Sequence, residues 1–212
     1  ELSITGYTCG DLFLQEPLLT GALEALALFT KEKEKLDTLF FAGLPILHQG
    51  RLFNVVAAVF HGRVLGLVPK SHIPMYSEFY EGRHFAAAPD KNTRHKLSFQ
   101  DEEVCFGTRQ LFVCAQIPAL SVAVEICEDL WVPLPPSSYH AMAGATVIVN
   151  ASASDEATGK AAYRRELVKG QSARAVAGYL YADAGRGEST TDLVYSAHNI
   201  IAENGTVLAE SR

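Results

Sequence analysis

The sequence lacks several features that would assign it to a familiar class of protein. No apolar run approaches the roughly 18–20 residues that a membrane-spanning helix needs, so we expect no membrane-embedded part. Positive charge is not in excess, since the formal net charge is -6, and this argues against nucleic-acid binding and against a basic membrane-binding face. Metal-binding patterns are missing too, because no CxxC spacing and no companion histidine pair occurs among the four cysteines Cys9, Cys105, Cys114 and Cys127. So few cysteines in 212 residues suit a reducing compartment, and we expect a cytoplasmic location.

A start that looks like a natural N-terminus is also missing. The chain begins directly with ELSITGY, without Met, a signal peptide or a polar lead-in. A charged residue followed by Leu-Ser-Ile is typical of the exit of a strand. We therefore expect that Glu1 follows a missing first strand and helix, and that Arg212 is a cut edge as well.

The patterns that are present predict one α/β domain over residues 1–212. Hydrophobic residues make up 48% and charged residues 20%, which is ordinary for a globular protein, and no repeat or linker divides the chain. Apolar residues recur at helical spacing in two long segments, and strands alternate with these segments. We predict helices over 11–35, 137–143 and 160–177, and strands over 36–47, 52–60, 63–68, 110–114, 121–126, 145–150, 179–182, 196–202 and 207–209. The hairpin turns are predicted at His61-Gly62 and Asn204-Gly205, and irregular chain over 69–103.

Cys127 is the first candidate for chemistry. It ends the apolar run SVAVEIC. The ends of strands are where α/β folds present their reactive side chains. Lys70 has a similar position after LGLVP. An unperturbed thiol is mostly protonated near neutral pH, so a nucleophilic cysteine needs an activating partner. Cys127 could equally be an ordinary core cysteine, and Lys70 an ordinary solvated lysine. The spacing of these residues alone does not decide between a structural and a catalytic role.

Two activation schemes remain open from the residues alone. In the first, a histidine takes the thiol proton. His72 and His84, in the irregular, aromatic-rich segment 69–85, are the best placed of the seven histidines. In the second, a glutamate is the base, and a lysine stabilises the thiolate and the developing oxyanion. Lys70 suits this second scheme.

Long segments of the sequence resemble the nitrilase superfamily of carbon–nitrogen hydrolases. They are GRLFNVVAAVFHGRVLGLVPKSHIPMYSEFYEGRHF, VAVEICEDLWVPLPPS, NASASDEATGK and YADAGRGESTTDLVYSAHNII. The strings CEDLW and GESTTDLV are, more narrowly, similar to the glutaminase domain of glutamine-dependent NAD synthetases. This resemblance covers nearly the whole chain. It implies an α-β-β-α four-layer sandwich and assembly as a homo-oligomer.

The resemblance implies a Glu-Lys-Cys triad. The nucleophile is Cys127 in EICEDLW, the lysine is Lys70 in VPKSHIP, and the general base is Glu1 in ELSITGY. A fourth, accessory glutamate corresponds to Glu81 in EGRHF, with Glu78 as the alternative, and it would hold Lys70 charged and oriented.

The glutamine pocket implied by the family is formed by Tyr76, Ser154 and Lys160, with Ser152 as an alternative to Ser154. Lys160 is expected to bind the α-carboxylate of the substrate. The family often places a proline after the NASAS segment, where this sequence has Asp155 instead. This departure affects the expected geometry of the loop.

The function implied by the resemblance is glutamine hydrolysis through a γ-glutamyl thioester. The ammonia would go to a separate synthetase domain that uses ATP, Mg and deamido-NAD, whereas this domain needs no metal and no cofactor. The chain contains no ATP-binding glycine-rich loop, since the glycines near Gly185 lack a strand-to-helix phosphate cradle. Two alternatives are a stand-alone amidase or nitrilase acting on another substrate, and a non-catalytic assembly module.

Overall fold

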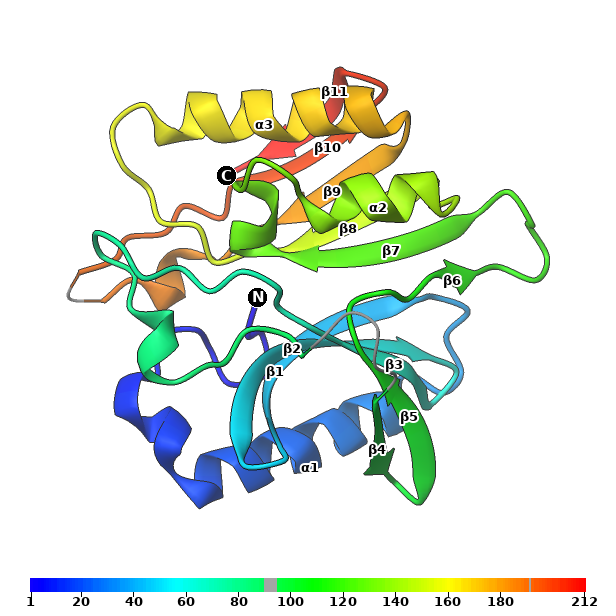
Figure 1. The fold of residues 1–212 in the computed structure, drawn as a ribbon, viewed down its shortest axis with the longest axis vertical. Helices are drawn as coiled ribbons and strands as arrows, with labels where there is room; N and C mark the ends of the chain where they lie inside the picture. The colour runs from blue at the N-terminus through cyan, green and yellow to red at the C-terminus, as the bar shows by residue number, and fades with distance from the viewer. Residues whose placement is uncertain (90–94, 191) are drawn as a thin grey trace. The chain divides into compact units, whose positions relative to one another are not determined.

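The computed structural model describes residues 1–89, 95–190 and 192–212, and in these ranges the chain forms two compact units (Figure 1). The units comprise residues 1–108 and 109–212. Each contains a β-sheet with helices packed against it, which confirms the predicted α/β class. The single domain over residues 1–212 stays a prediction. No helix of the described chain has the length and hydrophobicity that crossing a membrane requires.

The first unit contains a five-stranded sheet among its described residues, in the order β1-β2-β3-β5-β4. Strands β1, β2 and β3 form an antiparallel meander, and its two tight turns use left-handed residues at Gln49-Gly50 and His61-Gly62. This confirms the predicted hairpin at His61-Gly62. The elements of the unit are η1 (Gly10–Leu14), α1 (Glu16–Glu32), β1 (Phe40–His48), β2 (Arg51–Phe60), β3 (Arg63–Pro69), η2 (Glu81–Arg83), β4 (His95–Phe99) and β5 (Glu102–Phe106).

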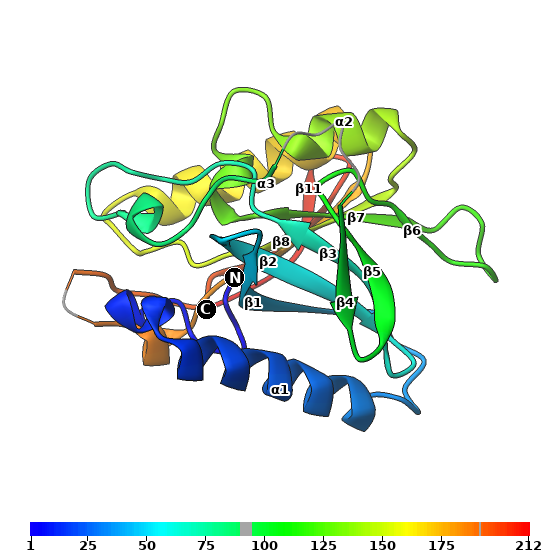
Figure 2. The same cartoon turned by 60° about the horizontal axis from the view of Figure 1, so that its bottom comes forward.

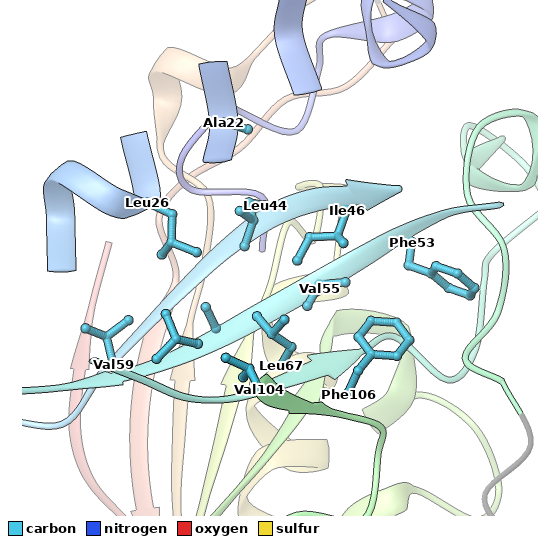
Figure 3. Packing of buried hydrophobic residues seen from close by; sticks show 12 residues of the cluster. Ala22, Leu26, Leu44, Ile46, Phe53, Val55, Val59, Leu67, Val104 and Phe106 are labelled. Atoms are coloured by element: carbon cyan, nitrogen blue, oxygen red, sulfur yellow. The ribbon is translucent and has the colours of Figure 1, made fainter. Parts of the chain in front are cut away.

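Helix α1 runs along the sheet of the first unit (Figure 2). Its side chains Ala22 and Leu26 are buried against the strands, where they contact a cluster of aliphatic and aromatic residues (Figure 3). Burying Leu26 completely contributes about 1.5–3 kcal/mol relative to leaving it in water. The strand side chains of this cluster include Leu44, Ile46, Phe53, Val55, Val59, Leu67, Val104 and Phe106. The core therefore fixes the strand meander that carries Lys70 at its end.

The second unit contains a six-stranded sheet among its described residues, in the order β11-β10-β9-β8-β7-β6. The three central strands β7, β8 and β9 are parallel. Helices α2 and α3 lie on one face of this sheet (Figure 1), where Val168 of α3 packs with Ile148 and Tyr179. The elements are β6 (Phe112–Val113), β7 (Ser121–Ile126), η3 (Cys127–Leu130), α2 (Pro136–Met142), β8 (Val147–Ala151), α3 (Lys160–Ala175), β9 (Gly178–Ala182), η4 (Arg186–Glu188), β10 (Asn199–Glu203) and β11 (Thr206–Ser211).

Several boundaries differ from the sequence prediction, each for a physical reason. The helix predicted over 11–35 is interrupted by the extended residue Gln15, after which α1 begins at Glu16 with Pro17 in its first turn. Strand β1 begins at Phe40 rather than at residue 36, because its partner β2 ends at Phe60 and offers no further pairing. Strand 196–202 begins at Asn199, and 110–114 is reduced to β6.

The polar stretch predicted as irregular over residues 86–103 contains strand β4 and the start of β5. Their apolar residues alternate along the chain, at Leu97, Phe99, Val104 and Phe106, and pack on the core of the first unit. The intervening residues are polar and partly solvated, which hid the strands in the sequence. Residues 90–94 of this stretch, and residue 191 in GESTTDLV, lie outside the described residues.

Candidate active site

Lys70 is the residue around which the site of the first unit is built. It follows β3 directly, and its side chain is 0% exposed. Its backbone N–H donates to the carbonyl of Asn54 at 2.8 Å, and its own carbonyl accepts from the N–H of Ala88 at 2.9 Å. Both sides of the lysine backbone are therefore fixed, which leaves the side chain little freedom of direction.

The ammonium of Lys70 lies between two buried carboxylates. Its Nζ donates to Glu1 Oε1 at 2.7 Å and to Glu81 Oε1 at 2.6 Å. The two glutamate side chains are 0% and 5% exposed. A buried charge is tolerated only when it is paired and hydrogen-bonded, and here two acids share a single base.

The pKa of Glu81 is raised to about 7, chiefly by burial and also by the neighbouring Glu1 carboxylate, against the opposing effects of Lys70 and of a hydrogen bond from Tyr7. The Tyr7 hydroxyl donates to Glu81 Oε1 at 2.7 Å. Near neutral pH, Glu81 is therefore partly protonated, whereas a solvated glutamate is almost fully ionised.

Glu1 is held by its backbone and by its side chain. Ile4 N–H donates to the carbonyl of Gly43 at 2.9 Å, and Gly43 N–H donates to Ser3 Oγ at 3.0 Å. A Cβ at Gly43 would lie 1.4 Å from the carbonyl oxygen of Glu1, so only glycine permits this approach. Asn54 Nδ2 donates to Glu1 Oε1 at 2.5 Å.

In the second unit, Cys127 occupies a sharp turn between β7 and η3. Its φ of 43° is in the left-handed region, which costs a non-glycine residue about 1–3 kcal/mol. Asp129 Oδ2 accepts the N–H of Ile126 at 3.0 Å and so closes the turn from the other side. The side chain of a residue in this conformation is directed differently from those of the preceding strand residues, at the point where β7 ends.

Asn150, the buried residue near the end of β8, holds this turn. Its Oδ1 accepts the N–H of Cys127 at 3.0 Å and the hydroxyl of Ser152 at 2.8 Å. Its Nδ2 donates to the hydroxyl of Tyr179 at 3.0 Å. One amide therefore connects the ends of β7 and β8 to the neighbouring strand β9.

The chain of hydrogen bonds continues from Tyr179 into the core of the second unit. The Tyr179 hydroxyl donates to Glu125 Oε1, and Glu125 Oε2 accepts the N–H of Ser137 at the start of α2 at 2.8 Å. Burial raises the pKa of Glu125 to about 7 and holds that of Tyr179 well above its usual value. The hydrogen-bonded pair of Tyr179 and Glu125 therefore supports the strand ends from within the core of the unit, where solvent is excluded.

The strand register brings the polar residues of the second unit to one edge of its sheet. Ile126, Ala151 and Ala182 form one aligned row across β7, β8 and β9. The next residue on each strand is Cys127, Ser152 and Asp183, and parallel strands in open sheets carry their binding residues at this end. Asp183 Oδ1 accepts the N–H groups of Ser154 and Ala184, at 2.8 and 3.0 Å, and burial raises its pKa to about 6.

The loop after β8 is tied to α3 by Arg164, whose side chain is fully buried. Its guanidinium donates to Ser154 Oγ at 3.1 Å and to the carbonyl of Asp155 at 2.7 Å. Lys160 forms an ion pair with Asp155 and lies 5.4 Å from the centre of the Trp131 ring. Asp155, which stands in place of the expected proline, therefore has an ion-pair partner at the start of α3.

The sequence model of the family described as carbon-nitrogen hydrolase matches residues 1–212, the whole chain. The chain belongs to the carbon-nitrogen hydrolase family. The predicted membership in this family is thereby confirmed.

Similar proteins within the family are glutamine-dependent NAD(+) synthetases. The Mycobacterium tuberculosis protein is 44% identical over 211 residues, covering 100% of this chain and 31% of its own length. The human protein is 27% identical, covering 99% of this chain and 30% of its own. The crystal structure of the Cytophaga hutchinsonii synthetase matches with a TM-score of 0.83 at 32% identity, over 99% of this chain and 33% of that one.

The chain thus spans about a third of the length of these relatives. An amidase of the nitrilase superfamily from Nesterenkonia has a TM-score of 0.70 at 15% identity, over 97% of this chain and 69% of that one. At this identity the match concerns the fold alone. The nitrilase-like α/β fold predicted from the sequence is confirmed.

The predicted residues of this carbon-nitrogen hydrolase fall into two groups. In the first unit the structure brings Glu1, Lys70 and Glu81 together, and the 2.6 Å contact to Lys70 favours Glu81 over Glu78. Tyr76, in the loop of the same unit, is 52% exposed and lies edge-on to Phe79.

In the second unit, Ser152 shares the oxygen of Asn150 with the backbone of Cys127, whereas Ser154 is bonded to Arg164. Lys160 lies at the start of α3. The roles assigned to these residues remain predictions. The described residues contain no group of three or more histidine, cysteine or acidic side chains that could hold a metal ion.

Sequence reasoning missed the asparagines that hold the two groups. Asn54 interrupts the apolar strand LFNVVAAVF, and Asn150 ends the apolar strand TVIVN. A polar residue within a buried strand must find hydrogen-bond partners, and this was the available signal. Glu125 carried the same signal, because it interrupts the buried apolar strand SVAVEI. Tyr7 carried none, because tyrosine has many ordinary positions.

Proposed function

We propose that this chain is a glutamine amidohydrolase that releases ammonia from the side-chain amide of glutamine. The observation that carries the proposal is the fully buried Lys70 at a strand end, 2.7 Å from Glu1 and 2.6 Å from Glu81. A buried ammonium between two carboxylates is costly for stability, and such arrangements cluster at functional sites. Glutamine as the substrate is supported by the names of the relatives that are 44% identical to the chain.

In the proposed reaction, the Glu1 carboxylate accepts the proton of the Cys127 thiol. The thiolate attacks the amide carbon of glutamine, and a C–S bond forms as the C=O π bond opens to an oxyanion. Lys70 and a backbone N–H near residue 128 stabilise that oxyanion. The C–N bond then breaks, and Glu1 returns the proton to the leaving nitrogen, which departs as ammonia.

The γ-glutamyl thioester is hydrolysed in a second half-reaction. Glu1 takes a proton from the attacking water, the tetrahedral intermediate collapses with cleavage of the C–S bond, and the proton returns to the sulfur of Cys127. Glutamate is the second product. The left-handed backbone of Cys127 supports this role, because it presents the sulfur at the end of β7.

The proposed pocket uses Tyr76, Ser154 and Lys160, with Ser152 as the alternative serine. Lys160 would bind the α-carboxylate of glutamine, for which Asp155 now competes, since the two residues form an ion pair. Substrate binding would therefore require Lys160 to exchange one carboxylate for another.

The ammonia is proposed to serve a synthetase domain that amidates deamido-NAD with ATP and Mg. The support is that the relatives are named glutamine-dependent NAD(+) synthetases and are about three times as long as this chain. A homo-oligomer and a reducing, cytoplasmic setting belong to the same proposal.

The test is ammonia release from glutamine by the wild type and by Cys127→Ala. We expect the variant to lose at least about 10³-fold in kcat, because the covalent route is removed. Lys70→Met, which keeps the length of the side chain without its charge, is expected to fall comparably.

Controls separate this proposal from the other two readings. Equal rates for wild type and Cys127→Ala would overturn catalysis by this thiol, and would leave an assembly module. A higher kcat/KM for a nitrile or a short aliphatic amide than for glutamine would overturn the assignment of the substrate. Thermal unfolding of both variants verifies that they remain folded.

A further inference from the structure

The buried acid pair of the first unit poses a question that the proposed reaction leaves open. Glu1 and Glu81 each place one oxygen within 2.7 Å of the same Lys70 ammonium. Two carboxylates and one ammonium carry an unbalanced negative charge in a site without solvent, which favours the uptake of one proton near neutral pH. The reaction requires that this proton does not reside on Glu1, since a protonated base cannot accept a proton from Cys127.

Lys70 cannot decide which acid holds the proton, because its distances to the two differ by only 0.1 Å, at 2.7 and 2.6 Å. The second hydrogen-bond partner of each acid does differ. Glu1 Oε1 receives Asn54 Nδ2 at 2.5 Å, and Glu81 Oε1 receives the Tyr7 hydroxyl at 2.7 Å.

The two partners differ in what they can tolerate. An amide nitrogen donates only, so Asn54 stabilises a charged oxygen on Glu1 and opposes a proton placed on that oxygen. A hydroxyl can rotate and accept, so Tyr7 is compatible with Glu81 in either state. The contact between the Asn54 amide and the Glu1 carboxylate is therefore a difference between the two acids.

We propose that Asn54 is a positioning residue that keeps Glu1 ionised and leaves the proton of the acid pair on Glu81. The inference rests on the proposed function, in which Glu1 is the general base. Asn54 touches neither substrate nor sulfur in this proposal, and its side-chain amide acts through Glu1.

The attachment of Asn54 makes it suitable for this role. It is fully buried within β2, between the core residues Phe53 and Val55. Its backbone carbonyl accepts the N–H of Lys70 at 2.8 Å, while its side chain holds Glu1. One residue thus fixes both the lysine and the base, so their separation is set by a single peptide unit in the sheet.

The experiment is the pH dependence of kcat/KM for glutamine hydrolysis in the full-length protein, comparing wild type with Asn54→Leu. Leucine has a similar volume but no donor. Because loss of a hydrogen bond to the charged form raises the pKa of a carboxyl, we expect the acidic limb to move up by about one pH unit. The rate on the alkaline plateau should fall much less. A uniform loss at every pH, with the limb unmoved, would overturn the proposal and leave a structural role.

The matched control is Val55→Ala, on the same strand but directed into the apolar core. It loses packing without touching the acids, so its acidic limb should coincide with that of the wild type. If Asn54→Leu does not fold, Asn54→Ser removes the amide at smaller cost to packing, and should move the limb in the same direction by a smaller amount.

A second measurement does not depend on glutaminase activity. The carboxyl carbons of ¹³C-glutamate-labelled protein are titrated by NMR, and the Glu81 signal is identified by its loss in Glu81→Gln. We expect Asn54→Leu to lower the pH midpoint of the Glu81 signal, as the shared proton shifts toward Glu1. An unchanged Glu81 midpoint would overturn the inference even in an inactive protein. The expected shift in a protein without glutaminase activity would overturn only the proposed function.

Discussion

Cys127 combines a strained backbone with a buried backbone N–H that donates to the side chain of Asn150. The left-handed conformation persists because Asn150 accepts the N–H of Cys127 and Asp129 accepts that of Ile126. Strain of this kind is maintained only where several surrounding interactions enforce it. The direction of the sulfur therefore depends on side chains of other elements as much as on its own strand.

Asn150→Ala should expose this dependence. It removes the Asn150 oxygen that accepts the buried N–H of Cys127, and the loss of the partner of a buried donor costs about 1–3 kcal/mol. We expect the free energy of unfolding, measured by urea denaturation, to fall by about 2–3 kcal/mol, with a loss of ammonia release. Ser152→Ala is the matched control, since it removes only the hydroxyl that shares the Asn150 oxygen. A loss in Asn150→Ala no larger than in this control would contradict the account of the turn.

Individual residues were predictable when they stood at a strand end within a distinctive string. Cys127 and Lys70 met this condition, and the resemblance added Glu1 and Glu81. In the sequence, Asn54 is not distinguishable from any other polar residue within a strand. Its partner Glu1 is 53 positions away in sequence. Such pairing is a property of the folded sheet, so local pattern does not contain it.

At the scale of elements, strand β1 has a structural role beyond pairing with β2. Its residue Gly43 lies against the backbone of Glu1, where a Cβ would come within 1.4 Å of a carbonyl oxygen. The atom in the way belongs to the backbone, so a small side-chain adjustment cannot relieve the overlap.

Gly43→Ala should therefore displace Glu1 and its hydrogen bonds to Lys70 and Asn54. We expect ammonia release to fall by at least about 10²-fold, because a displacement near 1 Å at a catalytic group has this effect. Gly50→Ala is the control: this glycine also lies at the β1–β2 hairpin, and no atom comes within 4 Å of an added Cβ. Its φ of 74° makes the change destabilising, but ammonia release should persist below the melting temperature. Equal activity of Gly43→Ala and wild type would contradict the placement of Glu1.

Long periodic elements were predicted well, and their ends were not. The hairpin of β2 and β3 and the long helix α3 were found because their pattern extends over many residues. The pair β4 and β5 was missed because only one of its faces is buried and the other is polar. Strand limits such as that of β1 depend on where a partner strand ends, which is not encoded next to the limit itself.

For the molecule as a whole, buried acids shape the response to pH. Burial raises the pKa of Glu81, Glu125 and Asp183 above the usual values. In the folded state these groups still bind protons at pH values where the unfolded chain has already released them. The free energy of unfolding therefore falls as pH rises from the usual pKa values near 4 to the raised values of about 6 to 7.

Glu125→Gln tests this at a group that lies 1% exposed. Its pKa rises from the usual 4.5 to about 7, and at roughly 1.4 kcal/mol per pH unit the wild type should lose about 3 kcal/mol between these values. The Glu125→Gln variant lacks this pH-dependent loss. The difference in the free energy of unfolding between wild type and variant, measured by urea denaturation, should therefore shrink or reverse as pH rises. Glu24→Gln, on an exposed position of α1, is the control. A pH-dependent change of similar size in that variant would contradict the burial argument.

The aligned row of Ile126, Ala151 and Ala182 also limits how this sequence can change in length. Side chains alternate between faces along a strand, so one inserted or deleted residue within β7, β8 or β9 would turn its terminal polar group away from the others and move it by about 3.3 Å. The hairpin turn at Asn204-Gly205 carries no such group and can absorb an insertion. Length variation in functional descendants of this chain should therefore concentrate in the turn between β10 and β11 and be excluded from the three parallel strands.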